Sequence, residues 1–265
     1  ETDAADSIPK AIAAGRKLAA FNSSIAVQPR VTDLTPRNIK DELTGVHLIL
    51  DGSDNFETRY LINDFAVEKF VPWIYTTAVG SYGATMNIVP GQTACLTCIF
   101  SGPPKGTNET CETAGVLNSV VTMVASIAAA EAIKLLVGAE DHFRRSLLSF
   151  DLWLNERAEV STFKTRSDCR TCGQRDFVHL NGDERPQITL CGRNSVQIHE
   201  RHRLVDLVEV TGSHEPLGMV RHNEFVLKFW LDPYEMTLFP DGRAIIKGTV
   251  DKALARSLYA RYIGA

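Results

Sequence analysis

The chain has 265 residues, of which 44% are hydrophobic and 23% are charged, a composition typical of a globular protein with one large core or two smaller ones. Its formal net charge of -4, with both signs interspersed, gives no basic surface and argues against nucleic acid as a partner. The acidic N-terminus has no basic segment followed by an apolar one, so no secretory signal is visible.

The first part of the chain alternates helix and strand signals. Ser7 to Phe21 has a serine cap, an early proline and apolar residues at helical spacing, which predicts a helix. A short strand is expected at Ile25–Val27, and a second helix is expected to open at Thr35-Pro36. The apolar run Val46–Leu50 is typical of a buried parallel strand.

This alternation continues toward the middle of the chain. Helical periodicity returns between Tyr60 and Phe70, and strands are expected at Trp73–Tyr75 and Gly83–Val89. Strands that alternate with helices predict an α/β sheet built from crossover connections.

The stretch Ala114–Val137 is apolar almost all round and long enough to cross a membrane. Polar residues interrupt it, among them Glu131 and Lys134, and this favours the buried core helix of a large sheet. We therefore expect no membrane partner. A closing strand is expected at Ser149–Leu154.

After Gln174 the composition shifts to a short α+β pattern, so we place a domain boundary there, with domains at 1–174 and 175–265. Strands are expected at Phe225–Trp230 and Met236–Phe239, and Asp251 is a good N-cap for a final helix.

Four of the six cysteines form two CxxC pairs, Cys95 with Cys98 and Cys169 with Cys172. Such pairs bind metal in reducing compartments, which indicates the cytoplasm. Four thiolates close a tetrahedral structural Zn²⁺ site and leave no position for water. The alternative is two unrelated pairs, one of them a redox dithiol, but neither pair has a thioredoxin-like context.

Two further places are candidates for ligand binding. The segment Asp51–Asn55 follows a predicted parallel strand, where open α/β sheets bind ligands, although a carboxylate there can also simply cap the next helix. Lys10, at a helix start, is either a solvated charge or a phosphate contact.

Several motifs follow one another in a characteristic order. They are Asp51-x-x-Asp54-Asn55-x-x-x-Arg59-x-x-x-Asn63, the glycines Gly80 and Gly83, Pro-Gly before Cys95-x-x-Cys98, Thr110-Cys111-x-Thr113-Ala114-Gly115, Glu131-Ala132-Ile133-Lys134 and Cys169-x-x-Cys172. In this order the chain resembles the ThiF/MoeB/HesA family from Ser7 to Gly173. The resemblance implies a Rossmann-like doubly wound sheet and ATP-dependent adenylation of the C-terminal glycine of a ubiquitin-like sulfur carrier such as ThiS or MoaD, for thiamine or molybdopterin biosynthesis. It also implies a homodimer.

The resemblance assigns roles residue by residue. Lys10 looks like the phosphate-contacting lysine of the family, and Asp54 looks like the aspartate that holds Mg²⁺ and the nucleotide, with Asn55 as its partner. Cys111 matches a cysteine that forms a thioester or persulfide link to the carrier in some members; the alternative for a free cysteine is a small buried hydrophobe.

The sequence also departs from the family. The family's first strand, glycine-rich loop and acidic ribose-binding residue do not precede Glu1, so we expect an N-terminally incomplete sheet, poor ATP binding by the chain as written and a longer natural protein. One alternative function is a catalytically silent scaffold that binds a ubiquitin-like protein. A second, a nucleotide-dependent oxidoreductase, lacks a glycine fingerprint and leaves the CxxC pairs without a role.

Overall fold

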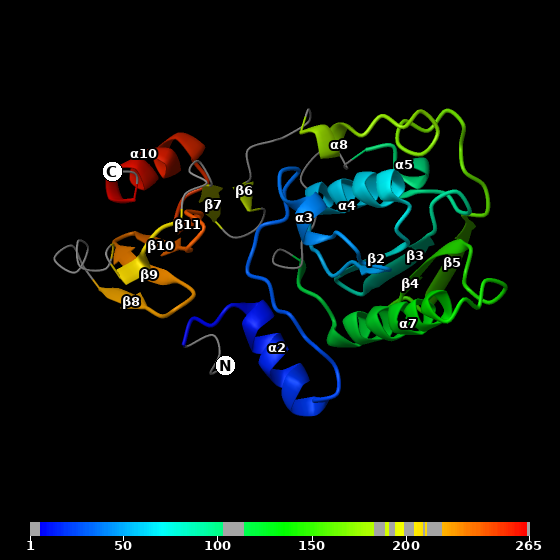
Figure 1. Ribbon diagram of the computed structural model, residues 1–265, viewed down its shortest axis with the longest axis horizontal. Helices are drawn as coiled ribbons and strands as arrows, with labels where there is room; N and C mark the ends of the chain where they lie inside the picture. The colour runs from blue at the N-terminus through cyan, green and yellow to red at the C-terminus, as the bar shows by residue number, and fades with distance from the viewer. Residues whose placement is uncertain are drawn as a thin grey trace. The chain divides into compact units, whose positions relative to one another are not determined.

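The computed structural model describes residues 6–102, 114–182, 189–190, 194–198, 204–208, 210 and 219–263. They form two compact units (Figure 1): Leu34–Pro186, and a second unit that combines Glu1–Asp33 with Gln187–Ala265. These bounds differ from the single boundary expected after Gln174. The segment after Gln174 stays with the first unit because its helix α8 (Val178–Asn181) packs on α4 (Phe56–Lys69).

The Leu34–Pro186 unit is built on a five-stranded sheet. Its strands, hydrogen-bonded in chain order, are β1 (Ile49–Leu50), β2 (Trp73–Val79), β3 (Tyr82–Ile88), β4 (Ser146–Asp151) and β5 (Glu156–Ser161). Within the described residues only β1 and β2 pair in parallel, through the crossover helix α4, and the other neighbours are antiparallel. The α/β prediction is confirmed, but the sheet is mixed.

A tight hairpin explains why the crossovers stop after β2. Val79 pairs with Tyr82, so only Gly80 and Ser81 connect β2 to β3, and no helix fits in such a connection. Gly80 has a φ of +58°, in the left-handed region that glycine adopts without strain. Gly83 is needed for a different reason, because a Cβ there would lie 2.8 Å from the side chains of Phe150 and Val124.

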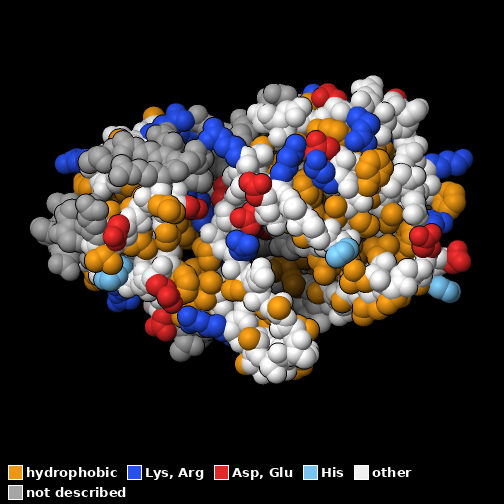
Figure 2. All heavy atoms as spheres, viewed as in Figure 1, with side chains coloured by type: hydrophobic (Ala, Val, Ile, Leu, Met, Phe, Trp, Pro, Cys, Tyr) orange, Lys and Arg blue, Asp and Glu red, His pale blue; other side chains and the backbone are white. Residues whose placement is uncertain are grey.

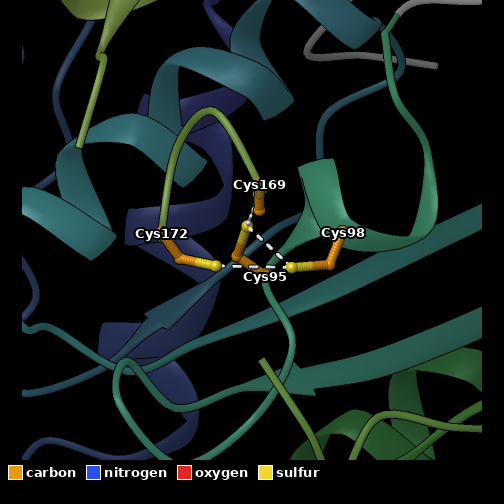
Figure 3. A group of neighbouring side chains, drawn as sticks. All are labelled: Cys95, Cys98, Cys169 and Cys172. Carbon is orange, nitrogen blue, oxygen red and sulfur yellow. Dashed lines mark hydrogen bonds between the residues drawn. The ribbon is translucent and has the colours of Figure 1, made fainter. Parts of the chain in front are cut away.

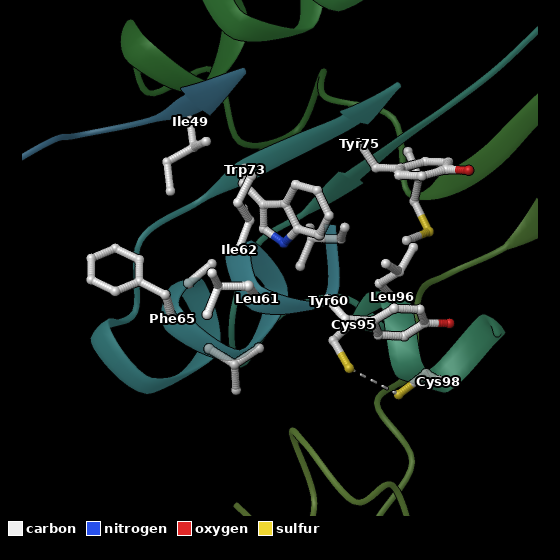
Figure 4. Close-up of a cluster of buried hydrophobic side chains, with 14 of the residues drawn as sticks. Ile49, Tyr60, Leu61, Ile62, Phe65, Trp73, Tyr75, Cys95, Leu96 and Cys98 are labelled. Carbon is white, nitrogen blue, oxygen red and sulfur yellow. Dashed lines mark hydrogen bonds between the residues drawn. The ribbon is translucent and has the colours of Figure 1, made fainter. Parts of the chain in front are cut away.

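Helices cover both faces of this sheet (Figure 1). Trp73 and Tyr75 of β2 pack into the core formed with α4, whereas Ile74 between them packs with α7 (Asn118–Leu136). Successive side chains of a strand point to opposite faces, so β2 is apolar on both sides. Figure 4 shows the α4 side of this core, with Trp73 between Ile62 and Tyr75.

The helix α7 is buried on one face only. Val120, Val124, Ala128 and Ala132, each four residues apart, are buried against the sheet. The opposite face exposes apolar side chains, with Ile133 63% and Leu136 62% exposed. Figure 2 shows hydrophobic side chains at many places on the surface of the molecule. By length and hydropathy α7 qualifies as a membrane span, and 28% of it is buried in the fold. The expected core helix is therefore confirmed for the face on the sheet.

The second unit contains a six-stranded antiparallel sheet. Its strands lie in the order β6 (Thr189–Leu190), β7 (Ser195–Ile198), β11 (Ala244–Lys247), β10 (Tyr234–Leu238), β9 (Leu227–Leu231) and β8 (Val220–His222). The helix α10 (Lys252–Tyr262) packs on it through Ala255 and Tyr259, and Asp251 caps that helix through the N–H groups of residues 253 and 254, as predicted. The helix α2 (Lys10–Phe21) belongs to the same unit.

Three local expectations differ from the structure. Ser7 does not cap α2, whose N-cap position is Pro9 without a side-chain hydrogen bond. Residues 25–27 form no strand among the described residues; Ile25 is 52% exposed, and no neighbouring strand offers it a partner. The helix expected at Thr35-Pro36 begins later, as the single turn α3 (Ile39–Glu42).

Candidate metal centre and nucleotide turn

The two CxxC pairs meet in the Leu34–Pro186 unit. Cys95 is the N-cap residue of the short helix α5 (Leu96–Ile99) and Cys98 lies within that helix, whereas Cys169 and Cys172 lie on the segment between β5 and α8. Their four sulfur atoms lie within 4.8 Å of one another and point toward a common centre (Figure 3). The sequence prediction that the pairs come together is confirmed.

The sulfur spacing fits a tetrahedral metal ion. The Sγ–Sγ distances are 3.8 Å from Cys95 to Cys98, 3.7 Å from Cys95 to Cys169 and 3.3 Å from Cys98 to Cys172. A tetrahedron with metal–sulfur bonds of about 2.3 Å has sulfur atoms roughly 3.8 Å apart. These residues can therefore hold a metal ion, and four thiolates leave no open coordination position.

The electrostatics of the four thiols also suit a cation. Hydrogen bonding to Cys169 and burial raise the pKa of Cys95, whereas hydrogen bonding to Cys172 lowers the pKa of Cys98. Such a cluster keeps some of its protons because four thiolates without a cation repel one another. A divalent cation replaces those protons, so metal binding releases them.

A glycine closes the second cysteine turn. The N–H groups of Gly173 and Gln174 both donate to the carbonyl of Cys169 at 2.9 and 2.8 Å. A Cβ on Gly173 would collide with the backbone carbonyl of Ser167. The glycine that directly follows the second CxxC is thus a requirement of the turn's geometry.

A second site begins where β1 ends. Asp51 is buried, its carboxylate accepts hydrogen bonds from the N–H and hydroxyl of Ser53 at 2.8 and 2.6 Å, and it pairs with the Nε of Arg59 at 3.2 Å. Arg59 also donates through Nη2 to the carbonyls of Ser53 and Thr76, at 2.7 and 2.8 Å. The buried side chains of Asp51 and Arg59 therefore hold the turn that follows β1 against the sheet.

Asp54 and Asn55 lie on the exposed side of this turn. The side chain of Asn55 accepts a hydrogen bond from the N–H of Thr58 at 2.8 Å, so Asn55 is the N-cap of α4. Asp51 therefore has a structural role in the turn. Asp54 is exposed at the N-terminus of α4, the end of a helix that favours bound anions such as phosphate.

Two of the expected site residues lie outside the described part of the Leu34–Pro186 unit. Lys10 is the first residue of α2, which belongs to the other unit. Cys111 lies outside the described residues. Arg59 and Asn63 belong to the sequence motif but had no predicted role. Asp64 was not predicted at all; its signal is the position of a carboxylate inside an apolar stretch of α4, where it is buried.

Comparison with known proteins places this chain in a family. Residues 1–171 match the ThiF family. The chain belongs to the ThiF family. It is 41% identical over its full length to the sulfur carrier protein ThiS adenylyltransferase of Bacillus subtilis, of which it covers 79%. It is 33% identical to the sulfur carrier protein adenylyltransferase of Thermus thermophilus over 64% of this chain and 66% of that protein. The family prediction is therefore confirmed.

Solved structures agree on the fold of this ThiF-family chain. Escherichia coli MccB bound to MccA-N7isoASN matches with a TM-score of 0.53 and 16% identity, over 62% of this chain and 52% of MccB. MccB bound to ATP matches with a TM-score of 0.52 and 17% identity, over 62% and 51%. At such identity the likeness shows the fold alone.

Proposed function

We propose that this chain adenylates the C-terminal glycine of a ubiquitin-like sulfur carrier of the ThiS or MoaD type, with ATP as the nucleotide. The 41% identity to a ThiS adenylyltransferase along the whole chain carries this proposal. The exposed Asp54, on a turn that Arg59 fixes from below, supports it from the structure. The name of that relative favours a ThiS-type carrier of thiamine biosynthesis over a molybdopterin carrier.

The reaction needs positioned charge more than proton transfer. An oxygen of the carrier's terminal carboxylate forms a bond to the α-phosphorus of ATP, the bond from that phosphorus to the bridging oxygen breaks, and pyrophosphate leaves with the electron pair. No proton has to move, so the residues of the chain bind and orient. Asp54 and Asn55 are assigned to the nucleotide and Lys10 to its phosphates.

Two metals belong to this proposal. Mg²⁺, when bound, offsets the charge of the leaving pyrophosphate, and one carboxylate, here Asp54, together with phosphate oxygens is a ligand set that suits it. Zn²⁺ is assigned to the four cysteines as a structural ion, because its preferred geometry matches their sulfur spacing. A cytoplasmic homodimer completes the proposal, and light scattering of the purified protein tests the dimer.

Cys111 is assigned the covalent link to the carrier. The sulfur of Cys111 would bond to the carrier's terminal carbonyl carbon as the bond to AMP breaks, so a Cys111→Ala variant is expected to exchange pyrophosphate like the wild type while forming no thioester adduct with the carrier. Intact-mass analysis of the reaction mixture detects the adduct, and an adduct that persists in the variant rejects this assignment.

The adenylation step is tested by isotope exchange between pyrophosphate and ATP, measured on the protein at its natural length with its carrier. Asp54→Ala is expected to lower exchange by about 100-fold or more, because the variant lacks the carboxylate assigned to the Mg²⁺ that offsets the charge of the reacting phosphates. Asp41→Ala, which changes an exposed aspartate of α3, is the matched control and should exchange at the wild-type rate. Equal exchange by both variants would reject the role of Asp54.

A further inference from the structure

Two neighbouring residues of α4 reach both cysteine segments. Asn63 accepts the N–H of Leu96 at Oδ1, at 2.8 Å, and donates from Nδ2 to the hydroxyl of Thr97 at 3.2 Å. Asp64 accepts the hydroxyl of Thr171 at Oδ1, at 3.2 Å. Both Asn63 and Asp64 are fully buried, so the hydrogen bonds to Leu96 and Thr171 form away from water, whereas the one to Thr97 is partly buried.

The two threonines hold the same place in the two cysteine motifs. Each precedes the second cysteine of its pair, in Cys95-Leu96-Thr97-Cys98 and in Cys169-Arg170-Thr171-Cys172. Their Oγ1 atoms lie 3.0 Å apart, although 74 residues separate them in the chain. The two cysteine segments are therefore joined by a direct hydroxyl–hydroxyl hydrogen bond in addition to the four sulfur atoms.

The chemistry of the side chains fixes which group donates in each hydrogen bond of this series. A carboxylate only accepts, so the hydroxyl of Thr171 donates to Asp64. Thr171 has then used its single proton and must accept the proton of Thr97, and Thr97 in turn accepts from the amide of Asn63. Each of the four side chains thus has a hydrogen-bond partner, and bonds that point the same way strengthen one another.

Asp64 also anchors the chain beyond the cysteines. Its Oδ2 accepts the N–H groups of His179 and Leu180, at 2.9 and 3.3 Å, at the start of α8. The carboxylate thereby links α4, the second cysteine segment and α8. Among the described residues, the hydrogen bonds of Asn63 and Asp64 go to neither a cysteine sulfur nor the turn with Asp54.

We propose that the sequence of hydrogen bonds Asn63–Thr97–Thr171–Asp64, here the threonine relay, holds the two cysteine pairs at metal-binding distance and so slows the release of the bound ion. This inference rests on the proposed zinc site. The four residues are positioning residues, because they act on the ion only through the cysteine segments. Partners that orient metal ligands in this way are worth about 10- to 100-fold in metal affinity.

Zinc release from the purified protein into a chromogenic chelator tests the relay. Thr171→Val and Thr97→Val replace a hydroxyl by a methyl group of similar size and are each expected to release zinc about tenfold to 100-fold faster than the wild type. Thr171→Ser restores the hydroxyl and should restore the wild-type rate. A double Thr97→Val, Thr171→Val variant should release little faster than either single variant, because one missing link already breaks the relay.

Thr162 provides the matched control. It is a buried threonine of the same unit whose hydroxyl has no hydrogen-bond partner among the described residues. Thr162→Val should therefore release zinc at the wild-type rate, and circular dichroism should show all variants folded at the assay temperature.

The outcomes separate this inference from the proposed site. Wild-type protein that binds no zinc rejects the metal site and the relay with it. Wild-type protein that binds one zinc per chain, with Thr171→Val and Thr162→Val releasing it equally slowly, overturns the relay and leaves the metal site in place.

Discussion

Arg59 is a buried cation on which the turn with Asp54 depends. Its side chain is 5% exposed, and its partner Asp51 is fully buried. Replacing Arg59 by methionine leaves the Asp51 carboxylate buried without a charge partner and two carbonyls without their donor. We expect this variant to lose about 3–5 kcal/mol of unfolding free energy, measured by urea denaturation.

The control for that measurement is an exposed ion pair of the same unit. Arg157 pairs with Glu159 at 2.7 Å, and its side chain is 67% exposed. Arg157→Ala should change the unfolding free energy by less than about 1 kcal/mol, because exposed pairs contribute little. If Arg59→Met and Arg157→Ala were equally stable, Arg59 would not be the residue that fixes the turn.

Glu131 gives a pH-dependent test at the same scale. Burial opposes its ionisation, but hydrogen bonds from Lys134, the N–H of Arg144 and Asn87 outweigh burial and lower the pKa of Glu131 below 4.5. A lowered folded-state pKa means that the charged form adds stability above the unfolded-state pKa and loses it as the pH falls through the folded-state value.

Glu131→Gln is therefore expected to be less stable than the wild type at neutral pH by about 1–3 kcal/mol. The NH₂ group of glutamine cannot accept the hydrogen bonds that one carboxylate oxygen accepts from its donors. That difference should begin to shrink as the pH falls below about 4.3, the ordinary pKa of glutamate, because the unfolded chain binds its proton there while folded Glu131 binds it only at lower pH. Chemical denaturation over a pH series measures it, and a constant difference down to pH 3 would contradict the assigned hydrogen bonds.

At the scale of the element, α4 carries both the nucleotide turn and the contacts to the cysteine segments. Asn55 caps its first turn, so Asn55→Ala should cost about 1 kcal/mol of stability, whereas Asn55→Asp keeps the acceptor and should remain as stable as the wild type. If the amide also contacts the nucleotide, Asn55→Asp binds ATP more weakly at unchanged stability. ATP binding equal to that of the wild type would limit Asn55 to its capping role.

The elements that sequence predicted well are those whose signal is local. The helices α4, α7 and α10 follow from apolar spacing or a capping aspartate, and the strands β2, β9 and β10 follow from runs of β-forming residues. The antiparallel β2–β3 pair was not expected, because a two-residue turn at Gly80 is a weaker signal than the strand–helix alternation around it.

In the candidate metal site, too, the local features were predictable from sequence and the long-range contacts were not. The two cysteine pairs are recognisable from their spacing alone, and their meeting confirmed that prediction. The threonine relay was not predictable from sequence. It depends on the Thr97–Thr171 contact, which spans 74 residues of the chain, and on the Asp64–Thr171 contact, which spans 107. A threonine or an asparagine carries no signal of such a distant contact in its own sequence neighbourhood.

At the scale of the molecule, the metal site lies wholly within one of the two units. Both cysteine pairs belong to Leu34–Pro186, and none of the six strands of the other sheet contributes a ligand. Removing the metal with a chelator is therefore expected to speed amide hydrogen exchange in α5 and α8 and to leave β7, β10 and β11 unchanged. Hydrogen exchange by mass spectrometry distinguishes this from a loss of protection spread over both units.

The central claim is that this ThiF-family chain adenylates a carrier, and exchange of labelled pyrophosphate into ATP tests it most directly. The account predicts exchange that requires a ubiquitin-like carrier with its C-terminal glycine, and no exchange with the same carrier shortened by that glycine. Carrier that binds the protein tightly while no exchange occurs would contradict adenylation and would identify a scaffold instead.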